Sequence, residues 1–186
     1  MAVRAASQTA EVGTTHSHPV SSSADPTLAP FERMVADKKF MCTMCGKCCT
    51  GEGEVWVSDK EATKIAGHLD MGLPQFYDTY SKAYSKHTGW RLLKSKLGST
   101  DCVFLGEDKK CGIHAVRPGQ CSTYPWWPEM MTEEGWRWEK ENLCEGFDHP
   151  DAGELDVVSA AKQLRDMTIQ SHIKSLSHVK YNGGGK

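Results

Sequence analysis

The sequence predicts a small, loop-rich α+β domain, with short strands and a few helices organised around cysteine-ligated metal. Three observations predict this class. All eight cysteines of the 186-residue chain lie between Cys42 and Cys144. The 17 glycines and 8 prolines, beside only 39% hydrophobic residues, indicate many loops and a modest core. Apolar periods typical of helices and strands occur only in short segments, apart from one longer helix near the C-terminus.

The chain divides into three parts by composition. Residues 1–30 hold nine Ser or Thr but few charges, and we interpret them as a disordered tail or an organelle transit peptide. Residues 31–180 are expected to form the cysteine-rich, zinc- or iron-chelating domain, and residues 181–186 a flexible end. No apolar segment follows Arg4, so we expect no secretory signal and an intracellular protein. It would lie in a plastid or mitochondrion if residues 1–30 are a transit peptide, and otherwise in the cytoplasm.

Two short helices are expected in the first half of the domain. Phe31, Met34 and Val35 recur at helical spacing and predict one helix ahead of the first cysteines. Ser58 and Glu61 have the spacing of a capping box and predict the start of another. An apolar stripe continues this second helix: Ala62, Ile65, Ala66 and Leu69.

The rest of the domain is expected to hold one further short helix, three strands and a long helix. Residues 74–84 predict the short helix, with Pro74 in its first turn and one aromatic side made by Phe76, Tyr77, Tyr80 and Tyr84. Residues 89–96 and 101–105 read as strands, with a turn at 106–110. Because Trp136 and Trp138 alternate, residues 135–140 read as a third strand. The longest helix is expected from Leu155 to Ile173 or Leu176.

The cysteines are the candidate metal ligands, and they form two groups. The first group is the compact segment "CTMCGKCC", with Cys42, Cys45, Cys48 and Cys49; the second is spread over Cys102, Cys111, Cys121 and Cys144. Thiolates select zinc, copper(I) or iron–sulfur clusters. Disulfides are disfavoured, because no secretory signal is expected and four cysteines within eight residues make poor bridge geometry.

The adjacent pair Cys48 and Cys49 bears on the number and kind of metal sites. Neighbouring side chains diverge, so either the pair serves two metals or one thiol is not a ligand. Eight thiolates divide into two sites of four, one with Cys42, Cys45 and Cys48 and the other with Cys49. Structural zinc requires four ligands in a tetrahedron. A [4Fe–4S] cluster offers separate iron corners to diverging thiolates, which favours iron–sulfur over zinc.

Three residues near the distal cysteines are further candidates. His114 could replace a thiolate, but a loop histidine is the preferred interpretation because the thiolates already suffice for two sites. Arg117 could offset the negative charge of a thiolate site or clamp a carboxylate, or it could be an ordinary surface arginine. Trp126, with the next two residues, is expected to cover the cofactor and exclude water; an exposed aromatic patch for a partner is the alternative.

The two cysteine-bearing segments together resemble a known family. "CTMCGKCC" followed by "DCVFLGEDKKCGIHAVRPGQCSTYPWWP" is similar to the C-x-x-C-x-x-C-C, zinc- or iron-chelating proteins of the YkgJ type, over roughly residues 39–147. The resemblance implies a metal site built from these cysteines. It also implies a relation to the flagellin lysine N-methylase group, in which an iron–sulfur cluster and S-adenosylmethionine are associated with the domain.

Three functions are therefore in view. The first is a metal-binding protein, with an iron–sulfur cluster or zinc, that has a structural, assembly or redox role beside a protein partner. The second is an enzyme that performs cluster-dependent methyl transfer to protein lysine. The third is an interaction module that zinc holds together. A net charge of −2 argues against nucleic acid as a partner, and no apolar run is long enough to span a membrane.

Overall fold

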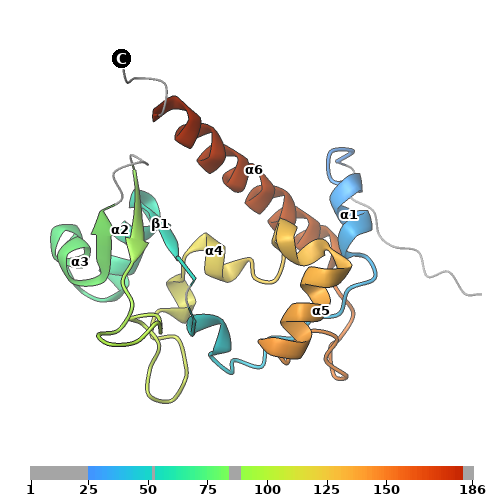
Figure 1. Ribbon diagram of the computed structural model, residues 1–186, viewed down its shortest axis with the longest axis horizontal. Helices are drawn as coiled ribbons and strands as arrows, with labels where there is room; N and C mark the ends of the chain where they lie inside the picture. Colours follow the sequence, from blue (N-terminus) through green and yellow to red (C-terminus); the bar gives the residue numbers. More distant parts are fainter. Residues whose placement is uncertain (1–24, 52, 84–88, 182–186) are drawn as a thin grey trace, which may run out of the picture.

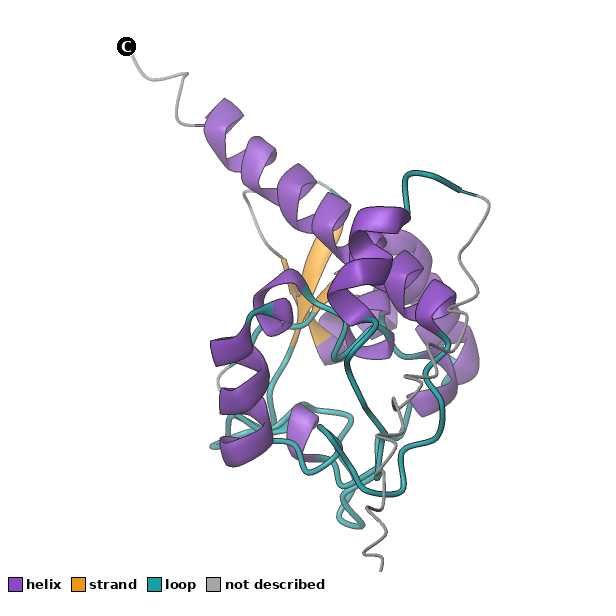
Figure 2. Ribbon diagram, turned by 90° about the vertical axis from the view of Figure 1, so that its right-hand side faces the viewer, coloured by secondary structure: helices purple, strands orange, loops and turns teal. Residues whose placement is uncertain are grey.

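The computed structural model describes residues 25–51, 53–83 and 89–181, and in these ranges it confirms the α+β class. Six α-helices and one three-stranded antiparallel sheet are joined by long loops and 3₁₀ turns (Figures 1 and 2). Most of the proposed tail, the far C-terminal end and Tyr84 lie outside the described residues. None of the described helices has the length and apolar character needed to cross a membrane.

The elements gather into two lobes with separate hydrophobic cores. The helical lobe consists of α1 (Ala29–Val35), the 3₁₀ turn η3 (Pro128–Met131), α5 (Glu133–Asn142) and α6 (Val157–Tyr181). The sheet lobe consists of β1 (Trp56–Ser58), α2 (Asp59–His68), α3 (Leu73–Tyr80), β2 (Ser81–Ala83), β3 (Trp90–Leu93) and the 3₁₀ turn η2 (His114–Val116). In Figure 1 the sheet lobe lies on the left and α1 and α5 lie on the right, and α6 runs from the right toward the upper left.

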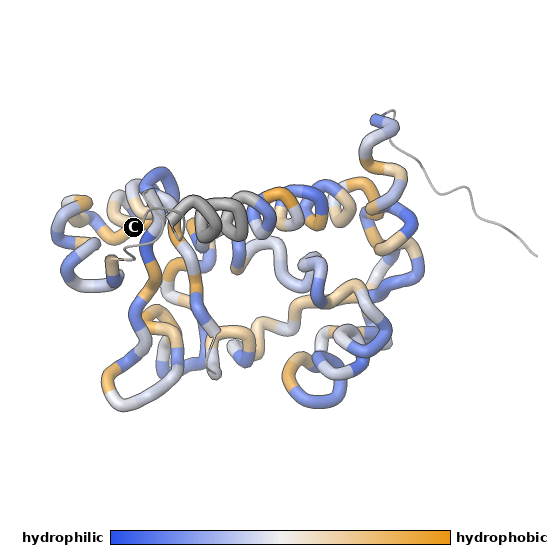
Figure 3. The backbone as a smooth tube through the Cα atoms, turned by 45° about the horizontal axis from the view of Figure 1, so that its top comes forward, coloured by the Kyte–Doolittle hydropathy of each residue, from blue (hydrophilic) through white to orange (hydrophobic). Residues whose placement is uncertain are grey.

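In the helical lobe, α6 packs along α1 and over an aromatic cluster. Hydrophobic and hydrophilic residues alternate along the N-terminal part of α6 (Figure 3), and its apolar side buries Ala160, Ala161 and Leu164. Phe147 and Trp136 meet edge to face, with ring centroids 4.4 Å apart. The expected helix begins two residues later than Leu155, because the Asp156 side chain accepts a hydrogen bond from the backbone N–H of Ser159 and so marks its start.

In the sheet lobe, the strand order is β1-β3-β2, and Val57 lies opposite Arg91. The predicted capping box at the start of α2 is confirmed: the Ser58 side chain accepts from the Glu61 N–H at 3.3 Å, and the Glu61 carboxylate accepts from the Ser58 N–H at 2.8 Å. The predicted strand over 89–96 is confirmed in part, because β3 covers only residues 90–93. The core beneath these elements contains Val57, Ile65, Phe76, Phe104 and Ile113.

Three other predicted elements were wrong in part or in whole. The helix expected over 74–84 ends at Tyr80, and β2 follows because residues 81–83 pair with β3. Residues 101–105 form no strand; single bridges join Cys102 to Ser95 and Leu105 to Cys111.

The third error concerns residues 135–140, which belong to helix α5 instead of a strand. Thr132 starts this helix, since its hydroxyl accepts from the Gly135 N–H at 3.0 Å, and two glutamates occupy the first turn. The two tryptophans do face different environments, as the strand prediction required: Trp136 is buried, whereas Trp138 is 55% exposed. A helix separates them equally well, because residues two apart differ by about 200° around its axis.

Candidate metal centre

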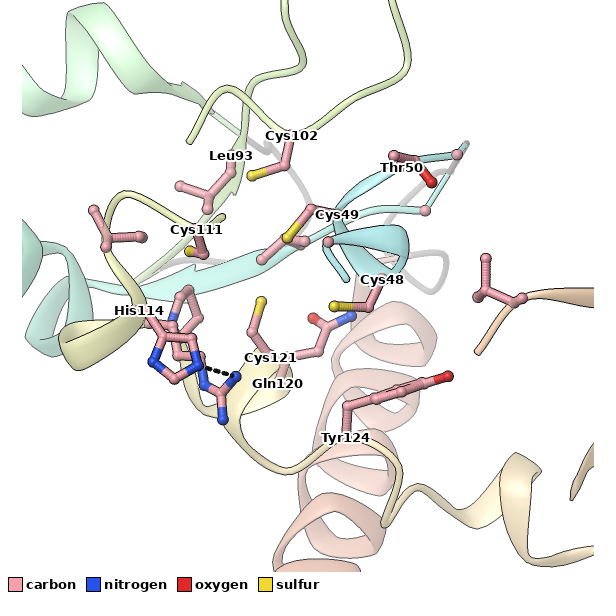
Figure 4. A pocket seen from close by; sticks show the side chains of 18 of the residues that line it. Cys48, Cys49, Thr50, Leu93, Cys102, Cys111, His114, Gln120, Cys121 and Tyr124 are labelled. Carbon is pink, nitrogen blue, oxygen red and sulfur yellow. Dashed lines mark hydrogen bonds between the residues drawn. The ribbon is translucent and has the colours of Figure 1, made fainter. Parts of the chain in front are cut away.

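Five cysteines line one cavity of about 650 Å³ between the two lobes: Cys48, Cys49, Cys102, Cys111 and Cys121. Figure 4 shows their sulfur atoms directed toward a common space. Leu93 and Ile113 of the sheet lobe form part of the wall, and Trp127 and Leu143 close it from the helical side. Cys42 also lies on the wall, so six of the eight candidate ligands share this cavity.

Gly46 shapes the turn that carries the adjacent cysteine pair. Its φ of +76° starts the 3₁₀ turn η1 (Lys47–Cys49), in which the Cys49 N–H donates to the Gly46 carbonyl at 2.9 Å. The loop of Lys109 approaches closely, because a Cβ on Gly46 would lie 2.1 Å from the Lys109 carbonyl oxygen. Glycine suits this position because it takes a left-handed backbone conformation without a steric cost.

The first cysteine segment is joined to the second by the backbone. The Cys102 N–H donates to the Cys49 carbonyl at 2.7 Å. Cys111 is held by its bridge to Leu105, and the neighbouring Gly112 N–H donates to the Phe104 carbonyl at 2.8 Å. These bonds bring residues more than fifty positions apart to the same wall of the cavity.

Cys121 lies on the short helix α4 (Gly119–Ser122), which two side chains fasten to the sheet lobe. The Gly119 N–H donates to the second carboxylate oxygen of Glu61 at 2.7 Å, so the α2 capping box also holds α4. Gln120 accepts from the Trp56 N–H at 3.1 Å and donates to the Glu54 carbonyl at 2.9 Å. The orientation of Cys121 therefore depends on α2 and β1.

Cys48 and Cys49 face the same cavity, contrary to the expected divergence of neighbouring side chains. The Cys49 thiol has the largest influence on the pKa of both neighbours. It lowers the pKa of Cys48 to about 7 and that of Cys111 to about 6, while these two thiols, with burial, raise the pKa of Cys49 itself. The tight 3₁₀ turn allows this arrangement, so the pair is not divided between two sites by geometry alone.

The other two cavity thiols are controlled mainly by burial. Burial raises the pKa of Cys121 to about 12 and also raises that of Cys102. The positive charge of Arg117 acts in the opposite direction on Cys121, and it helps to lower the pKa of Cys48 and Cys111. Arg117 lines the cavity, and its Nη1 lies 3.1 Å from Nε2 of His114.

Cys45 and Cys144 lie apart from this group. Burial in the helical lobe raises the pKa of Cys144, and the nearby Cys45 raises it further. Glu145, next to Cys144, accepts hydrogen bonds from Thr43 and Lys47, each at 3.0 Å, and so ties the first cysteine segment to the helical lobe. Neither Cys45 nor Cys144 belongs to the lining of the 650 Å³ cavity.

The tryptophans expected over the site have different positions. Trp126 is 6% exposed and packs in the helical core beside Phe40 and Trp136, outside the cavity lining. Its neighbour Trp127 does line the cavity, and its Nε1–H donates to the Gln120 carbonyl at 3.1 Å. Trp126 therefore belongs to a hydrophobic core, whereas the next residue, Trp127, lines the cavity.

Sequence reasoning did not find a buried acid at the cavity. Glu139 is 5% exposed, lines the cavity and accepts a hydrogen bond from the Tyr124 hydroxyl at 2.6 Å. Burial, followed by the bond to Glu139, raises the pKa of Tyr124. No local signal marked Glu139, because its segment was interpreted as a strand and its burial depends on the packing of α5.

The donor set fits a metal that prefers sulfur. The six thiols in the lining suit zinc or iron–sulfur chemistry better than magnesium or calcium, which prefer oxygen ligands. Across the described ranges, no three Cys, His, Asp or Glu side chains converge closely enough to hold a single ion. The thiols are spread around the wall of the cavity instead.

The fold and the cysteine-lined cavity define a small, thiol-rich α+β protein whose central loops carry the candidate metal ligands. Comparison with known families agrees: residues 41–145, more than half of the chain, match the CxxCxxCC family, described as "Putative zinc- or iron-chelating domain". The chain belongs to this family. No solved structure matches it.

Proposed function

We propose that this metal-binding protein holds an iron–sulfur cluster, [4Fe–4S] in preference to zinc, among Cys48, Cys49, Cys102, Cys111 and Cys121. One observation carries the proposal: these five thiols and that of Cys42 line a single cavity, yet no three ligating side chains among the described residues meet at one point. A zinc ion needs four sulfurs about 2.3 Å from one centre. A cluster accepts each thiolate on a separate iron, so it suits thiols that are spread apart.

The cofactor would have a structural role between the lobes. Cys102 and Cys111 belong to loops of the sheet lobe. The first cysteine segment begins in the helical lobe, where Phe40 bridges Phe147 and the Met41 N–H donates to the Gly146 carbonyl at 3.0 Å. A group bound by both sets of thiols would cross-link the lobes and contribute its binding free energy to folding.

The direct test is chemical analysis of the full chain, made in iron-replete cells and purified without oxygen. We expect coloured protein with absorption from thiolate-to-iron charge transfer, and iron matched by acid-labile sulfide. Colourless protein that contains zinc would overturn the iron–sulfur proposal and leave a zinc site.

Single substitutions test which thiols belong to the centre. Cys111→Ala removes a thiol from the cavity lining, so it should abolish most of the bound iron. Cys45→Ala is the matched control, because Cys45 lies outside the cavity lining, and it should retain the iron of the unsubstituted protein. Equal iron loss in both variants would instead support a ligand set that includes the whole first cysteine group.

A further inference from the structure

We propose that the cavity also binds a small organic anion with an apolar body, whose carboxylate or phosphate head is held by Arg117. This inference does not depend on which metal the thiols bind. It concerns Arg117 and the apolar side chains that line the same cavity.

The first support is the size and lining of the cavity. Its volume of about 650 Å³ lies within the range of roughly 300–1,000 Å³ that is typical of small-molecule sites. The thiols enter this space from several loops, and apolar side chains from both lobes make another part of its lining: Leu93, Ile113, Trp127 and Leu143. These side chains offer an apolar surface to the body of a small ligand.

The second support is the bonding state of Arg117. Its guanidinium has five N–H donors, and the structure assigns one contact, from Nη1 to Nε2 of His114 at 3.1 Å. Within the described part of the chain, no Asp or Glu forms an ion pair with Arg117. Because arginine can only donate, His114 must accept here, which orients the guanidinium and leaves its other donors for a ligand.

The third support is the chemistry of the polar groups in the lining. The Gln120 side chain binds two backbone groups next to and within β1, and the Trp127 N–H is donated to the Gln120 carbonyl. Among the residues that the structure describes, Arg117 is the one arginine in the lining, and the fork of its guanidinium matches the two oxygens of a carboxylate or phosphate.

Calorimetric titration of the full-length protein, with the metal it carries on purification, tests this proposal. The probes are benzoate and phenyl phosphate, with benzamide as the neutral analogue of the same shape. We expect saturable binding of at least one anion and at least tenfold weaker binding of benzamide. The anion that binds more tightly identifies the head group as carboxylate or phosphate.

Arg117→Lys keeps the positive charge beside the thiols but removes the guanidinium fork, so the metal should stay while anion affinity falls roughly tenfold. Arg137→Gln is the control, because Arg137 is exposed on α5 and lies outside the cavity lining; its affinity should equal that of the unsubstituted protein. The proposal is overturned if neither anion binds at millimolar concentration. It is also overturned if Arg117→Lys, with its metal retained, binds the anion as tightly as the unsubstituted protein.

Discussion

Gly46 shows how one residue decides the geometry of the cysteine turn. Two separate constraints act on it: a backbone in the left-handed region and a carbonyl oxygen of Lys109 where a Cβ would be. Gly53, in the same loop region, has neither constraint, since nothing lies within 4 Å of the Cβ it would gain. The two glycines therefore form a natural pair for comparison.

We expect Gly46→Ala to lower the free energy of unfolding by at least about 2 kcal/mol, because left-handed strain and a backbone clash add together. The metal content should fall as well, since the turn carries Cys48 and Cys49. Denaturant unfolding and metal analysis measure these effects, and Gly53→Ala should stay within about 0.5 kcal/mol of the unsubstituted protein. If both variants unfold alike, the close approach of Lys109 does not exist in solution.

The carboxylate of Asp148 makes the free energy of unfolding depend on pH. Partial burial alone would raise the pKa of its carboxyl, but hydrogen bonds from Lys140 at 2.9 Å and from Trp136 at 3.1 Å outweigh burial and hold the pKa below 3.8. A pKa that is lower in the folded state means that the ionised carboxylate stabilises the fold. This contribution is present above the ordinary pKa and disappears as the pH falls through the folded value.

Asp148→Asn isolates this charge. Asparagine tolerates the φ of +50° at this position, and its carbonyl oxygen can still accept from Trp136. We expect a loss of about 0.5 kcal/mol in the free energy of unfolding at pH 7, as for a partly exposed ion pair. In denaturant titrations across pH, the difference between the two proteins should vanish as the pH drops below 3.8. A difference that persists in strong acid would assign the effect to packing.

Among the secondary-structure elements, α2 and α4 depend on one carboxylate. Glu61 accepts from Ser58 with one oxygen and from the Gly119 N–H with the other. The capping box was predicted from the sequence because its partners are three residues apart. The hydrogen bond from the Gly119 N–H, 58 positions away in the chain, forms only when the sheet lobe is folded.

Glu61→Gln should separate these two uses. Glutamine has one oxygen acceptor, so either the Ser58 N–H or the Gly119 N–H loses its partner, at a cost of about 1–3 kcal/mol. The loosened α4 should also release part of the bound metal, because it carries Cys121. Thermal unfolding and metal analysis are the measurements, with the exposed Glu134→Gln in α5 as the control. Unchanged metal content in Glu61→Gln would show that α4 is held by other contacts.

On the scale of the whole molecule, two separate cores meet across a cysteine-lined cavity. The buried cluster around Trp136 and Phe147 shares no residue with the one around Ile65 and Phe76. Much of the coupling between the lobes would therefore come from the loops that carry the thiols and from the metal that they bind.

Removal of the metal should uncouple the two lobes. With metal bound, we expect amide hydrogen exchange in α2 and in α6 to report the same opening free energy, as in one cooperative unit. After treatment with a chelator under reducing conditions, the two helices should exchange with different free energies and the thermal transition should broaden. Readdition of the metal should restore the single transition. Identical exchange in α2 and α6 with and without metal would show that the cores are coupled through protein contacts alone.

The features predicted correctly depend on residues close together in the chain. The capping box of α2 and the strand β3 each follow from local backbone and side-chain preferences. The errors occurred where local patterns were ambiguous. The alternation of Trp136 and Trp138 fits both a strand and a helix, and only the packing of α5 in the helical lobe selects the helix.

The sequence by itself determined the chemical class of the site, because thiolates select soft metals wherever they meet and their close spacing is visible in the chain. Only the tertiary structure decided which thiols meet. It placed Cys48 beside Cys49 and Cys111, left Cys45 with Cys144, and put Trp126 in a core but Trp127 at the cavity. These outcomes rest on contacts such as that between the Cys102 N–H and the Cys49 carbonyl. Such contacts gain free energy only after a long loop has closed, so no local pattern encodes them.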